Sequence, residues 1–495
     1  FNNKLLHWKQ SMASTFFFYD LETSGFNPRA ERIMQFAGQR TDMDLNPIGE
    51  PTNELIRLSP DVLPSVQAVL LTGITPQQTI SDGLTEVEFL KQFYKEVVQP
   101  GTIFVGFNSI RFDDEFMRFL HYRNFYDAYE WQWKDGNSRW DVLDLVRMTR
   151  ALRPDGIKWP FASDGKPANR LEYLSKINKL DHDHAHDALS DVKATIAMAK
   201  LIKTKQPELF DYLLKHRDKK SVKEMVLSGK PFIYTSGRYS SEFQHTTAAV
   251  LLAKHPEQDA ALVYDLRFDP TLYLKMTVDD LTDAWRYNPD PDAVRFPVKT
   301  MKYNRSPTIA PLGVIKDEAS QANIGINLES VAKNLAALKS GQVEFAKKIE
   351  QVINKLDDER ERDQTTLIED QQGVDERLYE SFVGTSDKNI MSSIRSASPD
   401  ELSKFSESLT DERLKQLLPL YKARNYRKHL SEDEIHNWEE FCKQKLFAGG
   451  ASSVAAKYFE QISKLSQEKI TDEQRYLLEE LKLYGESILP VDEDG

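Results

Sequence analysis

The stretch Ser14-Thr-Phe-Phe-Phe-Tyr-Asp20-Leu-Glu22-Thr-Ser-Gly25 predicts a short apolar strand that ends in two carboxylates and then turns. Side chains two residues apart on a strand point to the same face, so Asp20 and Glu22 project together. Two carboxylates held this close repel each other unless one is protonated or a cation lies between them. A hard divalent metal ion fits such a pair, and a solvated acidic turn is the alternative.

The composition predicts a multidomain protein without disulfides. With 495 residues, the chain has room for two to four domains, at a typical size of about 100–200 residues each. Cys442 is the single cysteine, so internal disulfides and thiolate zinc sites are excluded. No stretch approaches the ~18 apolar residues that span a bilayer, and none has the pattern of a signal peptide. We expect a cytoplasmic protein with no membrane association, whose residues 1–13 form a disordered leader with Met12 as a candidate natural start.

The net charge of −12 is unevenly distributed, so it does not exclude a nucleic-acid partner. Residues 357–495 carry 19 basic and 31 acidic residues, a net charge of −12 that equals that of the whole chain. Residues 207–356 carry 21 basic and 19 acidic residues, among them the basic run 215–223. Local basic stretches rather than the overall charge decide nucleic-acid binding.

Residues 14–206 alternate strand and helix signals, which predicts a mixed α/β domain. The apolar spacing at Phe89, Leu90, Phe93 and Val97 predicts a helix over 87–98. Runs of apolar and β-branched residues predict strands at 16–22, 32–37, 48–58 and 102–107.

Asp113 is a second candidate metal ligand, because it begins a helix just after the predicted strand 102–107 and Asn108. Functional groups of α/β proteins are often found at this position. The alternative is that Asp113, Asp114 and Glu115 only compensate the positive end of the helix dipole.

The third candidate region is Asp181-His-Asp-His-Ala-His186-Asp-Ala-Leu-Ser-Asp191. A helix is predicted from Ala188 onward, and Asp191 lies one turn in, off its apolar face. On a continuous helix, five residues rotate by about 500°, so His186 and Asp191 converge only if His186 lies on the loop or first turn that feeds the helix. Asp187 is better placed as a helix cap than as a ligand. The alternative is a transition-metal site made of His182, His184 and His186.

In this order, the three motifs resemble the DEDD exonucleases of the histidine subtype. Other segments resemble the bacterial exonuclease I family more specifically, and with them the resemblance covers nearly the whole chain. They are residues 71–76, 124–127, 137–141, 151–154, 194–200, 299–307 and 421–426.

The resemblance implies an α/β multidomain architecture. The implied parts are a ribonuclease-H-like exonuclease domain with a mixed sheet (14–206), an SH3-like β domain with terminal helices (207–356), a charged linker (357–373) and a helical C-terminal domain (374–495). Short strands are expected at 232–234, 248–252, 261–266 and 298–303. Helices are expected at 328–338, 343–355, 401–409, 411–421, 432–446, 454–465 and 473–484.

The resemblance also implies a reaction: processive 3′→5′ degradation of single-stranded DNA to 5′-mononucleotides, in DNA repair and recombination. It assigns metal binding to Asp20, Glu22, Asp113 and Asp191, and the general base to His186. Two Mg²⁺ ions, for which Mn²⁺ can substitute, clamp the attacking and leaving oxygens in such a reaction. A histidine with an ordinary pKa of about 6.5 can accept the proton of the attacking water.

Candidate contacts with DNA lie in all three domains. They are Leu71, Thr72, Gly73, Asn108, Phe112, Arg139, Arg170, Tyr303, Arg305 and Arg424. Basic residues beside aromatic ones can follow phosphates and stack bases, and a solvated rim is the alternative. For Arg424, a structural contact is the other interpretation.

Family members also bind the C-terminal tail of single-strand-DNA-binding protein, which makes Arg153 and Tyr212 candidate contacts for that tail. Ordinary packing is the alternative, and Leu328 stands where relatives can carry a basic residue. A monomer is expected.

Two other functions remain open at this stage. A DEDD-type 3′→5′ exonuclease that acts on RNA would keep the same chemistry. A non-catalytic nucleic-acid-binding scaffold would keep only the fold.

Overall fold

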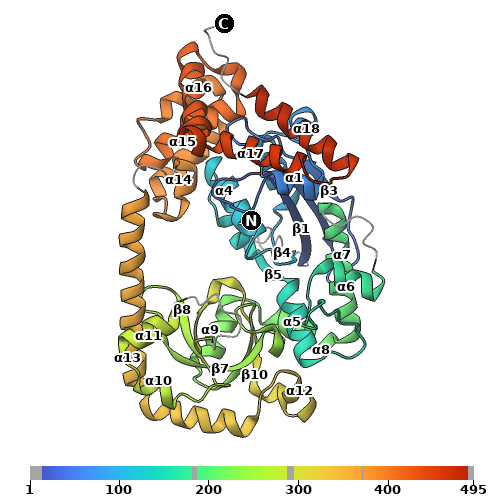
Figure 1. Cartoon of the computed structure of the whole chain (residues 1–495), viewed down its shortest axis with the longest axis vertical. Coiled ribbons are helices and arrows are strands. Elements are labelled where there is room, and N and C mark those ends of the chain that lie inside the picture. The colour runs from blue at the N-terminus through green and yellow to red at the C-terminus, as the bar shows by residue number, and fades with distance from the viewer. Residues whose placement is uncertain (1–13, 181–186, 287–294, 369–372, 489–495) are drawn as a thin grey trace, which may run out of the picture. The chain divides into compact units, whose positions relative to one another are not determined.

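The computed structural model describes residues 14–180, 187–286, 295–368 and 373–488 (Figure 1). The chain forms two compact units, and each is described by itself. Unit 1 contains Phe1–Ser138, Asp183–Lys193 and Gln372–Gly495, and unit 2 contains Arg139–His182 and Ala194–Gln371.

The first sheet has five strands in the order β3-β2-β1-β4-β5. Its central strand β1 (Thr15–Thr23) is antiparallel to β2 (Ile33–Thr41) and parallel to β4 (Thr102–Gly106), so the sheet is mixed as predicted. The edge strands are β3 (Thr52–Leu55) and β5 (Ser138–Asp141). Strand β3 is much shorter than the predicted 48–58, because Gly49 has φ +68° and Pro51 follows it.

Helices of unit 1 pack an aromatic core against this sheet. They are α3 (Glu86–Gln92), which continues as a π-helical turn at Phe93–Val97, and α4 (Asp113–Arg123). The other helices of this part are α1 (Val66–Thr72) and α2 (Pro76–Asp82). The rings of Phe36 and Phe89 have centroids 5.0 Å apart, and those of Phe104 and Trp131 are 4.8 Å apart. This buried core fixes β1, and with it the position of Asp20 and Glu22.

The C-terminal helices of unit 1 share two hydrophobic clusters with this α/β part. One cluster joins Phe119 and Tyr122 of α4 to Leu414 and Leu417, and the other joins α1 to the last two helices. The helices are α14 (Thr385–Ser396), α15 (Glu412–Asn425), α16 (Glu432–Phe447), α17 (Val454–Ser466) and α18 (Asp472–Ser487). The α-helix predicted at 401–409 is instead a 3-10 helix, Pro399–Phe405, followed by turns.

Unit 2 is built on an antiparallel sheet in the order β10-β6-β7-β8-β9. The strands are β6 (Phe232–Thr235), β7 (Thr246–Lys254), β8 (Ala260–Asp265), β9 (Val298–Lys302) and β10 (Thr308–Pro311). The helices are α5 (Val142–Leu152), α6 (Leu171–Asn178), α7 (Ala188–Lys205, which begins in unit 1), α8 (Pro207–Lys215), α9 (Lys219–Leu227), α10 (Thr271–Lys275), α11 (Val278–Trp285) and α12 (Glu318–Asn323). The sheet agrees with the expected small β domain.

A single helix, α13 (Leu328–Ile368), replaces the two helices and the start of the charged linker that were predicted for this region (Figure 1). Its charged part is helical because ion pairs support it: Lys355 contacts Asp279 at 2.8 Å and Glu359 contacts Arg286 at 2.9 Å, both on or next to α11. Of the helices in the described residues, none combines the length and apolar character needed to cross a membrane, α13 included.

Candidate active site

Three carboxylates of unit 1 form a compact cluster. Asp20 and Glu22 come from β1 and Asp191 comes from the first turns of α7, and one oxygen of each lies within 4.8 Å of the others. Glu22 is 8% exposed. The strand periodicity correctly placed Asp20 and Glu22 together, and the fold adds Asp191, which is distant in sequence. Three carboxylates at this separation can coordinate a hard cation through oxygen ligands.

Asp187 and Gln35 fix the start of α7. Asp187 caps the helix as predicted, because Ser190 N donates to Asp187 Oδ2 at 3.0 Å. Gln35 Nε2 donates to the other oxygen, Asp187 Oδ1, at 3.4 Å and to Asn53 Oδ1 at 2.9 Å. Gln35 lies opposite Glu22 in the register of β1 and β2. It is therefore a positioning residue for Asp191 that the sequence reasoning missed, although a polar residue on a buried strand opposite Glu22 was a usable signal.

Asp113 is the first residue of α4 and is 3% exposed. The chain reaches it through a tight turn in which Asn108 has φ +68° and Asp114 N donates to Ser109 O at 2.9 Å. Tyr19 OH donates to Asp114 Oδ1 and so ties this turn to β1. Asp113 is close enough to act electrostatically on the cluster, since its charge raises the pKa values of both Asp20 and Glu22.

Burial and like charges make ionisation of the cluster unfavourable when no cation is present. Burial is the largest cause that raises the pKa of Asp20 well above its ordinary value, and the charges of Asp113, Asp191 and Glu22 follow. Burial, Asp191 and Asp113 raise the pKa of Glu22 to about 9. Carboxylates kept together at this cost indicate a site for a cation, because a positive charge reverses all of these effects.

His186, the predicted general base, lies outside the described residues. So do His182 and His184, which with His186 formed the alternative transition-metal site. The oxygen-only donor set of the described cluster favours a hard cation over a transition metal.

The C-terminal end of α1 and its cap residue carry three of the predicted DNA contacts. Leu71 is 50% exposed, and Thr72 is partly exposed. Gly73 ends the helix with φ +73°, and a Cβ added there would meet no atom within 4 Å. Its glycine is thus required by backbone conformation rather than by close packing. Phe112 precedes α4 and packs on Phe116 with ring centroids 5.0 Å apart.

In unit 2, the predicted contacts have different environments. Arg139 Nη2 donates to Asn304 O at 2.6 Å, Arg305 belongs to a 3-10 turn that follows β9, and the side chain of Arg170 is 74% exposed. Tyr303 departs from the prediction: it is only 2% exposed and belongs to the hydrophobic core of this unit. A ring buried in this way is not available to stack on a base.

Arg424 is also buried, which corrects its assignment as a DNA contact. Its guanidinium binds Asp375 at 2.6 Å and Asp61 at 2.8 Å. Lys445 contacts Asp61 at 2.6 Å, and Arg32 contacts Asp375 at 3.2 Å. These five residues form a buried charge network that joins the α/β part of unit 1 to its C-terminal helices, so the structural interpretation of Arg424 holds.

The two candidate contacts for a protein tail, Arg153 and Tyr212, both lie in unit 2. Arg153 Nη2 donates to Val314 O at 3.2 Å. The ring of Tyr212 lies 4.5 Å from that of His216. Its hydroxyl is buried and has no hydrogen-bond partner among the described residues, and burial raises its pKa.

Family models match three consecutive regions of the chain. They are described as "Exonuclease" (residues 17–199), "Exonuclease I SH3-like domain" (217–355) and "Exonuclease I C-terminal domain" (372–488).

Curated relatives extend this match over almost the whole length. Exodeoxyribonuclease I of Haemophilus influenzae is 39% identical over 87% of this chain and 90% of the relative. Exodeoxyribonuclease I of Escherichia coli is 36% identical over 96% of this chain and 98% of the relative. An oligoribonuclease of Pseudoalteromonas translucida matches only 39% of this chain, at 27% identity over 95% of its own length.

Solved structures of exonuclease I, that of E. coli among them, have the same fold. The complex of the E. coli protein with a dA16 oligonucleotide aligns with a TM-score of 0.88 at 35% identity, over 96% of this chain and 100% of that chain. A zinc-bound form of an exonuclease I–ssDNA complex aligns with a TM-score of 0.87 at 35% identity, over 96% of this chain and 99% of that chain. An SSB/exonuclease I structure with an inhibitor aligns with a TM-score of 0.85 at 35% identity, over 96% of this chain and 100% of that chain.

Proposed function

The chain belongs to the exonuclease I family, and we propose that it degrades single-stranded DNA processively from the 3′ end to 5′-mononucleotides. The observation that carries this proposal is the cluster of Asp20, Glu22 and Asp191 in an exonuclease fold. The relatives that cover most of the chain are exodeoxyribonucleases, whereas an oligoribonuclease matches only its first part. This difference in coverage favours DNA over RNA as the substrate.

Mg²⁺ is the proposed metal, as two ions, with Mn²⁺ as a substitute. The donor set fits it, because the cluster offers only carboxylate oxygens and its pKa values are raised by burial and like charge. Asp20, Glu22, Asp113 and Asp191 would hold the ions. When bound, the ions supply positive charge that activates water and stabilises the leaving oxygen.

The remaining catalytic task falls to the chain itself. We assign the general base to His186, which takes the proton of the attacking water. Gln35 and Asp187 keep Asp191 in place, and Tyr19 does the same for the turn that carries Asp113.

Contacts with the strand are proposed for exposed or partly exposed residues. They are Leu71, Thr72, Gly73, Asn108, Phe112, Arg139, Arg170 and Arg305. Arg153 and Tyr212 remain proposed contacts for the C-terminal tail of single-strand-DNA-binding protein, a proposal supported by the solved SSB/exonuclease I structure. We further propose that the protein is a monomer and that it acts in DNA repair and recombination in the cytoplasm.

A substrate panel tests it. The wild-type protein and an Asp20→Asn variant are incubated with Mg²⁺ and 3′-end-labelled single-stranded DNA, duplex DNA and RNA. We expect mononucleotide release from single-stranded DNA alone, abolished in the variant. Equal digestion of RNA would overturn the substrate assignment, and no digestion of any substrate would overturn the enzymatic function.

A further inference from the structure

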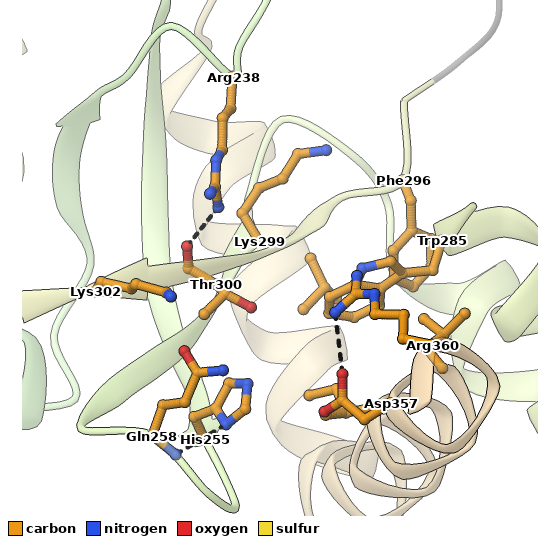
Figure 2. A pocket seen from close by; sticks show the side chains of 13 residues that line it. Arg238, His255, Gln258, Trp285, Phe296, Lys299, Thr300, Lys302, Asp357 and Arg360 are labelled. Carbon is orange, nitrogen blue, oxygen red and sulfur yellow. Dashed lines mark hydrogen bonds and ion pairs between the residues drawn. The ribbon is translucent and has the colours of Figure 1, made fainter. Parts of the chain in front are cut away.

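A cavity of about 370 Å³ lies in unit 2 (Figure 2). The residues that line it are distant in sequence from the acidic cluster, and none of them has a role assigned above. Its walls come from β9, the turn between β7 and β8, the end of α11, and α13. This volume falls in the range of ~300–1,000 Å³ that is typical of small-ligand sites.

The cavity is strongly basic in a chain that is acidic overall. Among the described residues, Arg238, Lys299, Lys302 and Arg360 line it, and Asp357 is the one lining carboxylate. With the lining histidine neutral, the walls carry a net charge of +3. Burial lowers the pKa of Lys299; the charge of Asp265 partly offsets this, and the positive charges of Arg238 and Arg295 lower it again, so an anion in the cavity would favour the charged form.

Hydrogen bonds hold two of the lining donors in place. Arg238 Nη1 donates to Thr300 O at 2.8 Å, which fixes the guanidinium against β9 (Figure 2). His255 Nδ1 accepts from the backbone N–H groups of Glu257 and Gln258, both at 3.2 Å. The neutral ring therefore carries its hydrogen on Nε2, which makes His255 a further donor without adding charge.

One wall of the cavity is aromatic. Trp285 and Phe296 lie with their ring centroids 5.3 Å apart and their planes tilted by 46°. Phe296 is buried, while Trp285 is partly exposed and is drawn next to Arg360 (Figure 2). A flat apolar surface next to several cations matches a ligand that has both an aromatic ring and a phosphate.

We propose that this cavity binds one internal nucleotide of a single-stranded DNA, with its phosphate among Arg238, Lys302 and Arg360 and its base against Trp285. The inference rests on the proposed function and extends it by adding this cavity to the strand contacts already proposed in unit 2. A nucleotide fits better than an acidic peptide, because every base has a flat face and every linkage carries one phosphate charge.

Binding of an oligothymidylate of about 16 nucleotides, within the range of single-strand site sizes, is measured by fluorescence anisotropy in EDTA to prevent hydrolysis. A Lys302→Gln/Arg360→Gln variant removes one cation from each of two facing elements. The matched control, Lys333→Gln/Lys339→Gln, removes two exposed cations from an earlier part of α13. We expect the first variant to bind more weakly and to reduce the slope of log K against log salt by up to about 0.7, the contribution of one single-strand phosphate contact.

A Trp285→Leu variant tests the base contact independently. We expect at least about fivefold weaker binding with an unchanged salt slope, because stacking is not ionic. The proposal is overturned if both cavity variants bind the oligothymidylate like the control. It is also overturned if the cavity variants lose affinity only for free thymidine monophosphate, or if an acidic peptide of glutamate and phenylalanine binds the cavity in place of DNA. Failure of the proposed function itself would appear separately, as no nucleotide release by the wild-type protein with Mg²⁺.

Discussion

The buried network of Arg32, Asp61, Asp375, Arg424 and Lys445 allows a prediction that separates a structural role from DNA binding. The intact network holds three cations and two carboxylates. An Asp375→Asn substitution leaves three cations against one carboxylate, and Arg424→Met leaves two against two. Breaking a buried ion pair costs about 3–5 kcal/mol because a charge remains uncompensated. We therefore expect Asp375→Asn to lower the free energy of unfolding by an amount in this range, and Arg424→Met by an amount at its lower end.

Urea unfolding of the full chain, followed by far-ultraviolet circular dichroism, measures this cost. With a slope near 3 kcal/mol per molar urea, a loss of about 3 kcal/mol moves the midpoint by about 1 M. Glu440→Gln is the matched control, because its 3.8 Å pair with Lys443 on α16 has both side chains 60% exposed. That change should stay within about 0.5 kcal/mol of wild type. The reasoning is refuted if Asp375→Asn behaves like the control, or if Arg424→Met keeps wild-type stability but loses affinity for DNA.

Three further predictions concern unit 1. Gly73→Ala should destabilise the protein by about 1–2 kcal/mol, measured by thermal unfolding, because φ +73° is unfavourable for alanine although there is room for its Cβ; an unchanged midpoint would contradict this. Burial lowers the pKa of His121 to about 4, whereas a histidine in the unfolded state has a pKa of about 6.5. As the pH falls, the unfolded state therefore binds a proton first. The free energy of unfolding should decrease by about 2 kcal/mol from about pH 7 to pH 5. A His121→Leu variant should lose that part of the pH dependence, and an identical pH profile would argue against it. Mg²⁺ at about 100 times its dissociation constant should stabilise the wild-type protein by about 2.7 kcal/mol, and Glu22→Gln should remove most of this effect; equal stabilisation of the two would place the metal elsewhere.

Local patterns were enough to predict the elements that carry the site. Asp20 and Glu22 follow from strand periodicity, and the start of α4 at Asp113 follows from the acidic turn after a buried strand. Convergence with Asp191 could not be derived in this way, because three segments distant in sequence meet only in the folded sheet. The role of Gln35 depends on the pairing register of β1 and β2, which no local pattern specifies.

The wrong predictions share a physical origin. Tyr303 and Arg424 stand in basic, aromatic segments, but composition does not reveal burial, and both side chains are inside the protein. The charged run from Asp357 was interpreted as a linker. A solvated helix has the same composition, and ion pairs such as Arg360–Asp357 at 3.0 Å support one here.

The direct test of the central claim is a time course on one single-stranded DNA labelled at the 5′ end in one sample and at the 3′ end in another. Wild-type protein with Mg²⁺ should release the 3′ label at once as a mononucleotide, while the strand that carries the 5′ label shortens in steps. Asp191→Asn should leave both labels intact although it still binds the strand in EDTA. Early release of the 5′ label, or wild-type rates in Asp191→Asn, would contradict 3′→5′ hydrolysis at the cluster of Asp20, Glu22 and Asp191.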